Sequence, residues 1–121
     1  MSRSDPPFLP RRRQMANRRP AVTFKLDHRM PSGAEHTFNV TVGLYDPKSP
    51  DIGEVFINTA GKAGSETDTM VSDAAVAISL ALQYGCPIEV LRSAMKRNPD
   101  GSPMGLASHV LDEACAAVGR S

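Results

Sequence analysis

Hydrophobic and polar residues alternate along two stretches in the first half of the chain, 21–28 and 36–45. Alternation with a period of two places every second side chain on the same side, which predicts half-buried strands. Turn-forming residues at 30–34 separate the stretches, so we expect a hairpin. The apolar sides consist of Val22, Phe24 and Leu26 in the first stretch and Phe38, Val40, Val42 and Leu44 in the second.

The stretch 53–85, GEVFINTAGKAGSETDTMVSDAAVAISLALQYG, joins the strongest strand signal to the strongest helix signal. Residues 54–58 are short, apolar and partly β-branched, which predicts a third strand. Ser65, followed by Glu66 and Asp68, has the composition of a helix start, and Gly85 that of a helix end. The helix between them has a wide apolar face, which should cover the sheet. Its polar residues, predicted on the opposite side, are Ser72, Asp73, Ser79 and Gln83.

Two more helices are predicted after Gly85. Pro87 suits the first turn of a helix over 88–97, and a loop at 98–103 precedes a last helix over about 105–118. The fold class is therefore predicted to be α+β, a three-stranded antiparallel meander covered by two to three helices. We expect the domain to span 21–119 and residues 1–20 to form a disordered arm, because they are rich in arginine and proline and poor in apolar side chains.

Charge separates the arm from the domain. Up to Pro20 there are six arginines and one acid, whereas eight basic and twelve acidic residues follow, and the whole chain carries a net charge of +1. The arm could bind the phosphates of a nucleic acid or an acidic protein. A solvated tail is the plainer interpretation, because no aromatic residues for base stacking are interleaved. The arginines concerned are Arg11, Arg12, Arg13, Arg18 and Arg19.

One segment has the composition of an anion site. Gly61, Lys62, Gly64 and Ser65 lie between the third strand and the long helix, where backbone N–H groups and one lysine could hold a phosphate or carboxylate, as in a nucleotide. The segment is neither a Walker A loop nor G-x-G-x-x-G. The alternative is a tight turn in which the glycines serve the backbone and Lys62 is solvated.

Other chemistry is not indicated by the sequence. His28, His36 and His109 lack the spacing of metal ligands, although His28 and His36 could meet across the hairpin. Cys86 and Cys115 are interpreted as reduced, structural thiols. No acid is spaced to act on a nucleophile, and neither a membrane span nor an export signal is present. We expect a cytoplasmic protein that binds no metal and no cofactor.

The succession GEVFINTAGKAGSETDTM and DAAVAISLALQYGCPIEVLR resembles the TSCPD domain. This domain occurs at the C-terminal end of cobalamin-dependent ribonucleoside-diphosphate reductases and as small stand-alone proteins, and the resemblance extends from Arg18 to Asp112. It implies a connection to deoxyribonucleotide supply for DNA synthesis. The catalytic barrel, radical and redox cysteines and adenosylcobalamin site of the reductases do not fit in so short a chain.

The chain departs from the family at two places where the longer members carry cysteines. The namesake S-C-P-D segment corresponds to 108–112, Ser-His-Val-Leu-Asp, and a Cys-Gly pair before the second strand corresponds to Ala34 and Glu35. Any metal or redox chemistry that those cysteines support would be lost here.

Two functions from different classes remain. The first is a stand-alone accessory or regulatory domain that binds the reductase or a nucleotide, the latter through 61–65. The alternative is a module whose arm binds nucleic acid and whose body forms a homodimer through the alanine-rich helix face. An independent enzyme is the least supported interpretation, because no catalytic site assembles from the sequence.

Overall fold

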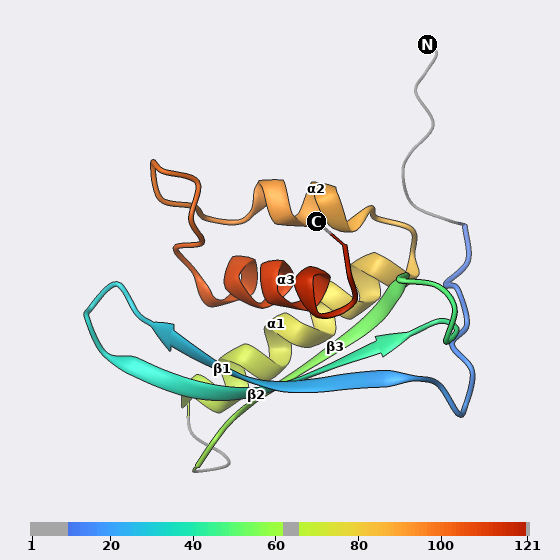
Figure 1. Ribbon diagram of the computed structural model, residues 1–121, viewed down its shortest axis with the longest axis horizontal. Coiled ribbons are helices and arrows are strands. Elements are labelled where there is room, and N and C mark those ends of the chain that lie inside the picture. Colours follow the sequence, from blue (N-terminus) through green and yellow to red (C-terminus); the bar gives the residue numbers. More distant parts are fainter. Residues whose placement is uncertain (1–9, 62–65, 121) are drawn as a thin grey trace.

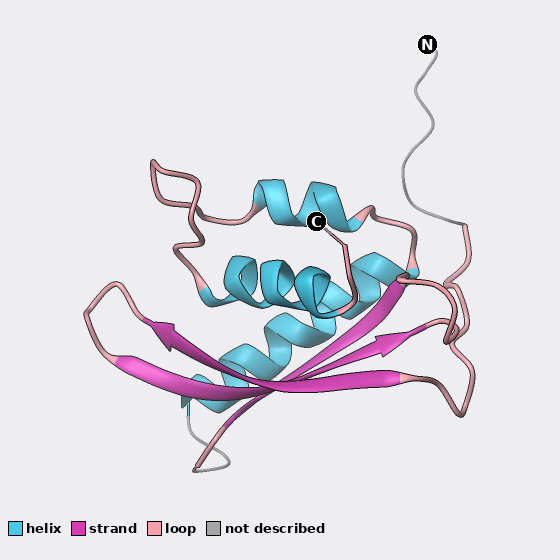
Figure 2. Cartoon of the chain, viewed as in Figure 1, coloured by secondary structure: helices cyan, strands magenta, loops and turns pink. Residues whose placement is uncertain are grey.

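The computed structural model describes residues 10–61 and 66–120, and it has the predicted α+β architecture (Figure 1). Its three strands form one antiparallel sheet in the order β1-β2-β3, so the predicted meander is confirmed. The three helices follow the strands in sequence (Figure 2). The elements are β1 (Ala21–Arg29), β2 (Glu35–Leu44), β3 (Ile52–Thr59), α1 (Glu66–Gln83), α2 (Ile88–Ala94) and α3 (Leu106–Ala117).

The register of the sheet sorts the side chains onto two faces. Val22 is paired with Val42 and Leu26 with Phe38 across β1 and β2, and Val42 is in turn paired with Val55 of β3. Directly opposed residues of an antiparallel pair point to the same side, so these apolar residues share the inner face. The outer face carries the residues between them, mostly threonine, asparagine and charged side chains.

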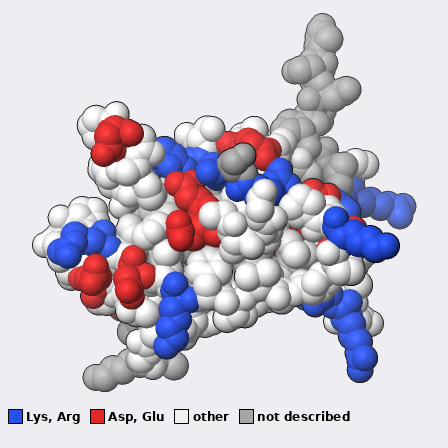
Figure 3. Space-filling view, viewed as in Figure 1, with Lys and Arg blue, Asp and Glu red and all other residues white. Residues whose placement is uncertain are grey.

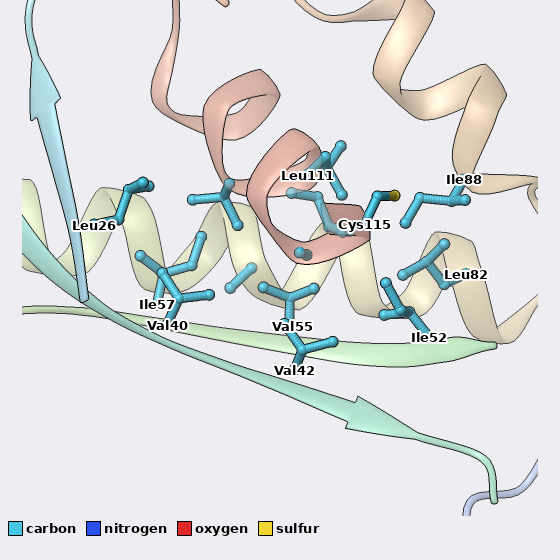
Figure 4. Packing of buried hydrophobic residues seen from close by; sticks show 14 of the residues in the cluster. Leu26, Val40, Val42, Ile52, Val55, Ile57, Leu82, Ile88, Leu111 and Cys115 are labelled. Atoms are coloured by element: carbon cyan, nitrogen blue, oxygen red, sulfur yellow. The ribbon is translucent and has the colours of Figure 1, made fainter. Parts of the chain in front are cut away.

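All three helices contribute side chains to a core on the inner face of the sheet. In Figures 1 and 2, α2 and α3 lie above the sheet and α1 crosses behind it. Figure 4 shows the apolar side chains of the strands pointing toward those of α1 and α3. The side chains buried almost completely include Phe38, Val40, Val42, Val55 and Ile57 from the sheet and Val110, Leu111, Ala114 and Cys115 from α3.

Two element boundaries differ from the prediction by two residues or more. β3 begins at Ile52 rather than Glu54, because the pairing with β2 shifts register beside Gly43 and continues to Leu44. α2 ends at Ala94 rather than at position 97, because Met95 adopts an extended conformation. Arg97 then forms an isolated bridge with Pro103, which closes the loop before α3.

The described part of the predicted arm, residues 10–20, contacts the body at both ends. The Arg13 N–H donates to the carbonyl of Gln83 at 2.8 Å, and the Leu44 N–H donates to the carbonyl of Pro20 at 2.9 Å. The Arg13 guanidinium lies 3.6 Å from the centre of the Tyr45 ring, a cation–π contact. The boundary between arm and domain at position 20 stays a prediction.

Candidate functional site

The outward edge of β3 is capped by polar side chains of α1. The Ser79 hydroxyl accepts from the Val55 N–H at 2.9 Å and lies 3.1 Å from the Val55 carbonyl, and the Gln83 amide donates to the Gly53 carbonyl at 2.8 Å. Asp68 accepts from the Thr59 N–H at 3.0 Å. A strand edge buried by a helix needs such partners, since an unpaired backbone group is costly away from water.

The predicted orientation of this polar side of α1 was therefore wrong for three of its four residues. Gln83 is buried, and Ser79 is half-buried against the strand, rather than facing solvent. Ser72 is half-buried as well, with its hydroxyl 3.4 Å from the Ile57 carbonyl. The apolar face was placed correctly, because Val71, Ala75, Ile78 and Leu82 all belong to the core.

A groove of about 300 Å³ runs along this capped edge, between β3 and the outer side of α1. Its apolar walls are Phe56 from the outer face of the sheet and Val76 and Leu80 from α1, whose exposed fractions are 50%, 58% and 40%. Val76 and Leu80 are four residues apart and therefore share one side of the helix. Their exposure together with an aromatic ring makes this groove the best-formed candidate for a binding surface.

A buried ion pair lies at one end of the groove. Arg19 donates to both carboxylate oxygens of Glu54, at 2.5 and 3.0 Å, and to the carbonyl of Ala16 at 2.6 Å. Glu54 is only 8% exposed, and it covers Gly43 so closely that a Cβ there would lie 2.3 Å from a carboxylate oxygen. The glycine thus makes room for the carboxylate, and the pair attaches the arm to the sheet.

The predicted anion site falls mostly outside the described residues. Lys62, Gly64 and Ser65 belong to the segment that is not described, and Gly61 alone can be placed, with a φ of +137° that favours glycine. Binding of a phosphate or nucleotide by Gly61, Lys62, Gly64 and Ser65 stays a prediction.

The described arginines of the arm differ in their contacts: two of them bind to the domain, and the other three are exposed. The Arg19 side chain pairs with Glu54. The Arg13 guanidinium lies over the Tyr45 ring and 3.7 Å from Asp51, so both arginine side chains already contact the domain of the same chain. Arg11, Arg12 and Arg18 are exposed, and Arg12 also borders the groove. Figure 3 shows basic and acidic side chains interspersed on the face in view, with no continuous basic area. Nucleic-acid binding through these arginines stays a prediction.

His28 and His109 are in contact, a pairing that the sequence does not predict. His28 and His36 are strand partners in the hairpin, as anticipated, but the His28 ring contacts His109 of α3 instead. The two Nδ1 atoms are 2.9 Å apart, so one ring donates a hydrogen bond to the other. His28 is 3% exposed, and its buried Nε2 has no hydrogen-bond partner among the described residues.

This contact predicts a stability that falls in acid. Burial, and secondarily the nearby His109, lowers the pKa of His28 below its ordinary value of 6.5. The unfolded chain therefore binds a proton on His28 more readily than the folded one, and stability present above pH 6.5 is lost as the pH falls through the folded pKa. Denaturant unfolding from pH 7.5 to 5.0 should show this loss in the native chain, by at most about 1.4 kcal/mol per unit of pKa shift.

His28→Leu should reduce that dependence on pH, whereas the same change at the exposed His36 should leave it in place. If His28→Leu and the native chain lose stability equally in acid, His28 is not the group responsible.

The family model of the TSCPD domain matches residues 10–119, nearly all of the chain and all of its strands and helices. The chain belongs to the TSCPD domain family. The resemblance seen in the sequence is thereby confirmed.

The TSCPD domain is also similar to part of a much longer protein. A vitamin B12-dependent ribonucleotide reductase of Rhodopirellula baltica is 37% identical over 84 residues, which cover 69% of this chain and 7% of the reductase. The chain thus matches only a small fraction of that relative's length. No solved structure matches the chain.

The segment 108–112, which the sequence predicts to correspond to S-C-P-D, makes structural contacts in this TSCPD domain. Asp112 accepts from Arg92 at 3.0 Å and binds Arg97 through both its oxygens, at 2.7 and 2.9 Å, which ties α3 to α2 and the following loop. These arginines lower the pKa of Asp112, Arg97 most of all. Ser108 is fully buried, with its hydroxyl 2.9 Å from the Lys96 carbonyl.

The described residues of the TSCPD domain show no reactive cysteine site, metal site or membrane-spanning helix. Cys86 and Cys115 are free and buried, and burial raises the pKa of the Cys115 thiol. Over 10–61 and 66–120, no group of three or more His, Cys, Asp or Glu side chains could hold a metal ion. Of the helices described, none has both the length and the apolar character that crossing a bilayer requires.

The groove and the ion pair were not predicted, although the sequence contains a signal for each. Val76 and Leu80 form a second apolar stripe beside the core stripe of α1, and Phe56 is an aromatic residue at an outward position of a strand. Glu54 is a charged residue within an otherwise apolar strand, which indicates a buried partner. Nothing local identifies that partner as Arg19, because the two are 35 residues apart in the chain.

Proposed function

We propose that this TSCPD domain is a non-catalytic binding module that docks on a vitamin B12-dependent ribonucleotide reductase and acts as an accessory or regulatory domain in deoxyribonucleotide supply. The observation that carries the proposal is the exposed groove of Phe56, Val76 and Leu80 in a domain whose relative is part of such a reductase. In that relative, the matched segment is covalently joined to the rest of the enzyme. A domain of this family that is not covalently joined to a reductase would need a surface that replaces this connection.

The chemistry of the groove fits a polypeptide. Its walls are apolar, and its ends carry Arg12 and the side chain of Asn58, which can orient a bound segment through hydrogen bonds. The capped edge of β3 is a poor template for another strand, because side chains of α1 already bond to several of its outward backbone groups. We therefore infer that the partner inserts apolar side chains between α1 and Phe56 rather than pairing with β3.

The proposal involves no cobalamin bound by this chain. The larger hollows of the described surface measure about 220 to 460 Å³, at or below the lower part of the range for drug-sized ligands, and a corrin with its nucleotide is much larger. The residues described also do not provide the catalytic groups of a reductase. In this proposal the chain acts only by binding the reductase. A cytoplasmic location is part of the same proposal.

Binding of the full chain to purified vitamin B12-dependent ribonucleotide reductase, measured by calorimetry, tests this proposal. We expect the native chain to bind and Val76→Asp to bind at least ~10-fold more weakly, because it places a charge in the apolar wall. Val90→Asp is the matched control, since Val90 is similarly exposed, at 53%, but lies on α2 away from the groove. It should bind like the native chain.

Two results would contradict the proposal. Absence of binding by the native chain would show that the reductase is not its partner. Equal weakening by Val76→Asp and Val90→Asp would show that the groove is not the contact surface.

A further inference from the structure

The two edges of the sheet differ in how far the rest of the described chain covers them. β3 is capped by α1, whereas β1 is an edge strand of nine residues with no such cover. The carbonyl of Pro20 and the N–H of Met30 both bond toward the β2 side, to Leu44 and Ala34. Because backbone groups alternate in direction along an antiparallel strand, the even-numbered residues face β2 and the odd-numbered ones face away.

Four central residues of β1 thus direct their N–H and C=O groups outward: Thr23, Lys25, Asp27 and Arg29. In the part of the chain that the structure describes, no backbone or side-chain group hydrogen-bonds to these outward groups. The edge therefore presents a continuous row of free donors and acceptors.

The side chains of β1 also leave apolar surface beside this row. Val22 and Phe24 are only half-buried on the inner face, whereas the corresponding residues of the central strand, Val42 and Val40, are fully buried. Part of Val22 and Phe24 is therefore available to a neighbour that extends the sheet. On the outer face, Lys25 and Asp27 are both exposed and are two residues apart.

We propose that β1 pairs with β1 of a second copy of this chain, antiparallel, about a two-fold axis at Leu26. This register sets Lys25 opposite Asp27 of the second copy and, by symmetry, Asp27 opposite Lys25 of the second copy. Both are positions whose backbone groups face outward, so about eight interstrand hydrogen bonds form between 23 and 29. Two sheets of three strands become one continuous sheet.

Charge complementarity favours this register over the two neighbouring ones. A two-fold axis at Lys25 would oppose two lysines, and an axis at Asp27 would oppose two aspartates, which is unfavourable for directly opposed residues. The axis at Leu26 pairs opposite charges twice. It also places Phe24 beside His28 of the second copy on the inner face, which extends the core across the contact. The surface is thus complementary to itself, as a symmetric dimer requires.

The contact differs from the homodimer expected from the sequence, which used the alanine-rich face of α1. Ala75 is 2% exposed and packs in the chain's own core, whereas Ala77 of the same helix is exposed, and dimerisation through α1 stays a prediction. The dimer proposed here leaves the groove of α1 open, and it stands whether or not the reductase binds there.

A charge-exchange experiment on the full chain tests the proposal by sedimentation velocity over a range of concentrations. The native chain should be a dimer. Lys25→Asp should weaken the dimer at least ~10-fold, since both opposite-charge pairs become like-charge pairs. Asp27→Lys should do the same, and the double variant Lys25→Asp/Asp27→Lys should recover the native affinity. Lys48→Asp, an identical change in the exposed turn before β3, should have no effect.

The double variant keeps the test decisive if a single variant folds poorly. Asp27 accepts a hydrogen bond from the Thr37 hydroxyl at 2.6 Å, so circular dichroism of each variant must show native content of strand and helix. A native chain that stays monomeric would overturn the proposal. So would a dimer that Lys25→Asp leaves intact, or a folded double variant that dimerises no better than the single ones.

Discussion

Replacing Arg19 with alanine should lower the free energy of unfolding well beyond the effect of changing its exposed neighbour Arg18, because it leaves the carboxylate of Glu54 buried without its cation. The guanidinium donates to both carboxylate oxygens, and the carboxylate lies in the space that the absent Cβ of Gly43 leaves over the sheet. The Arg19 side chain is itself 30% exposed, so we place the loss below that of a fully buried pair. Denaturant unfolding measures it directly.

The control for this prediction lies next to it in the chain. Arg18 is exposed, and Arg18→Ala should change the free energy of unfolding by less than about 0.5 kcal/mol. Glu54→Ala and the double variant with Arg19→Ala complete a cycle that isolates the pair. If Arg19→Ala and Arg18→Ala have the same small effect, the pair does not stabilise the fold.

Truncating Leu111 to alanine should lower the free energy of unfolding by about 3–4 kcal/mol. Leu111 is fully buried on α3, where it projects among the core side chains between the helices and the sheet (Figure 4). The substitution removes apolar contact and leaves a cavity that the surrounding helices cannot fill. The midpoint of thermal or denaturant unfolding should fall accordingly.

Leu80→Ala is the matched substitution at a surface position. Leu80 is 40% exposed, so the same change should cost less than about 1 kcal/mol. Similar losses for the two leucines would mean that α3 does not pack on the sheet as described.

The parts of the fold that were predicted correctly depend on local pattern. Alternation across Val22–Leu26 and Phe38–Leu44 reflects the pleat of a half-buried strand, and the apolar period of α1 reflects its contact with the sheet. The glycines and prolines at the turns identify where each element ends. None of these signals needs information from distant parts of the chain.

The candidate site was not predictable in the same way, because its contacts are non-local. His28 meets His109 from 81 residues away, and Glu54 meets an arginine that composition assigns to a disordered tail. The polar side of α1 looks like a solvent face in a helical projection. It becomes an edge cap only because the sheet places β3 alongside it, so Ser79 and Gln83 satisfy backbone groups instead of water.

The capping of β3 also limits how large an assembly can become. A sheet with two free edges can add neighbours at both sides and grow without end into a fibre, whereas a sheet with one free edge can be joined only once. With Asp68, Ser79 and Gln83 bonded to backbone groups of β3, the strand pairing that we propose for β1 would end at two copies. Substituting those three residues would therefore do more than lower stability. It would also expose the β3 edge, so that copies of the chain could pair at both edges of the sheet.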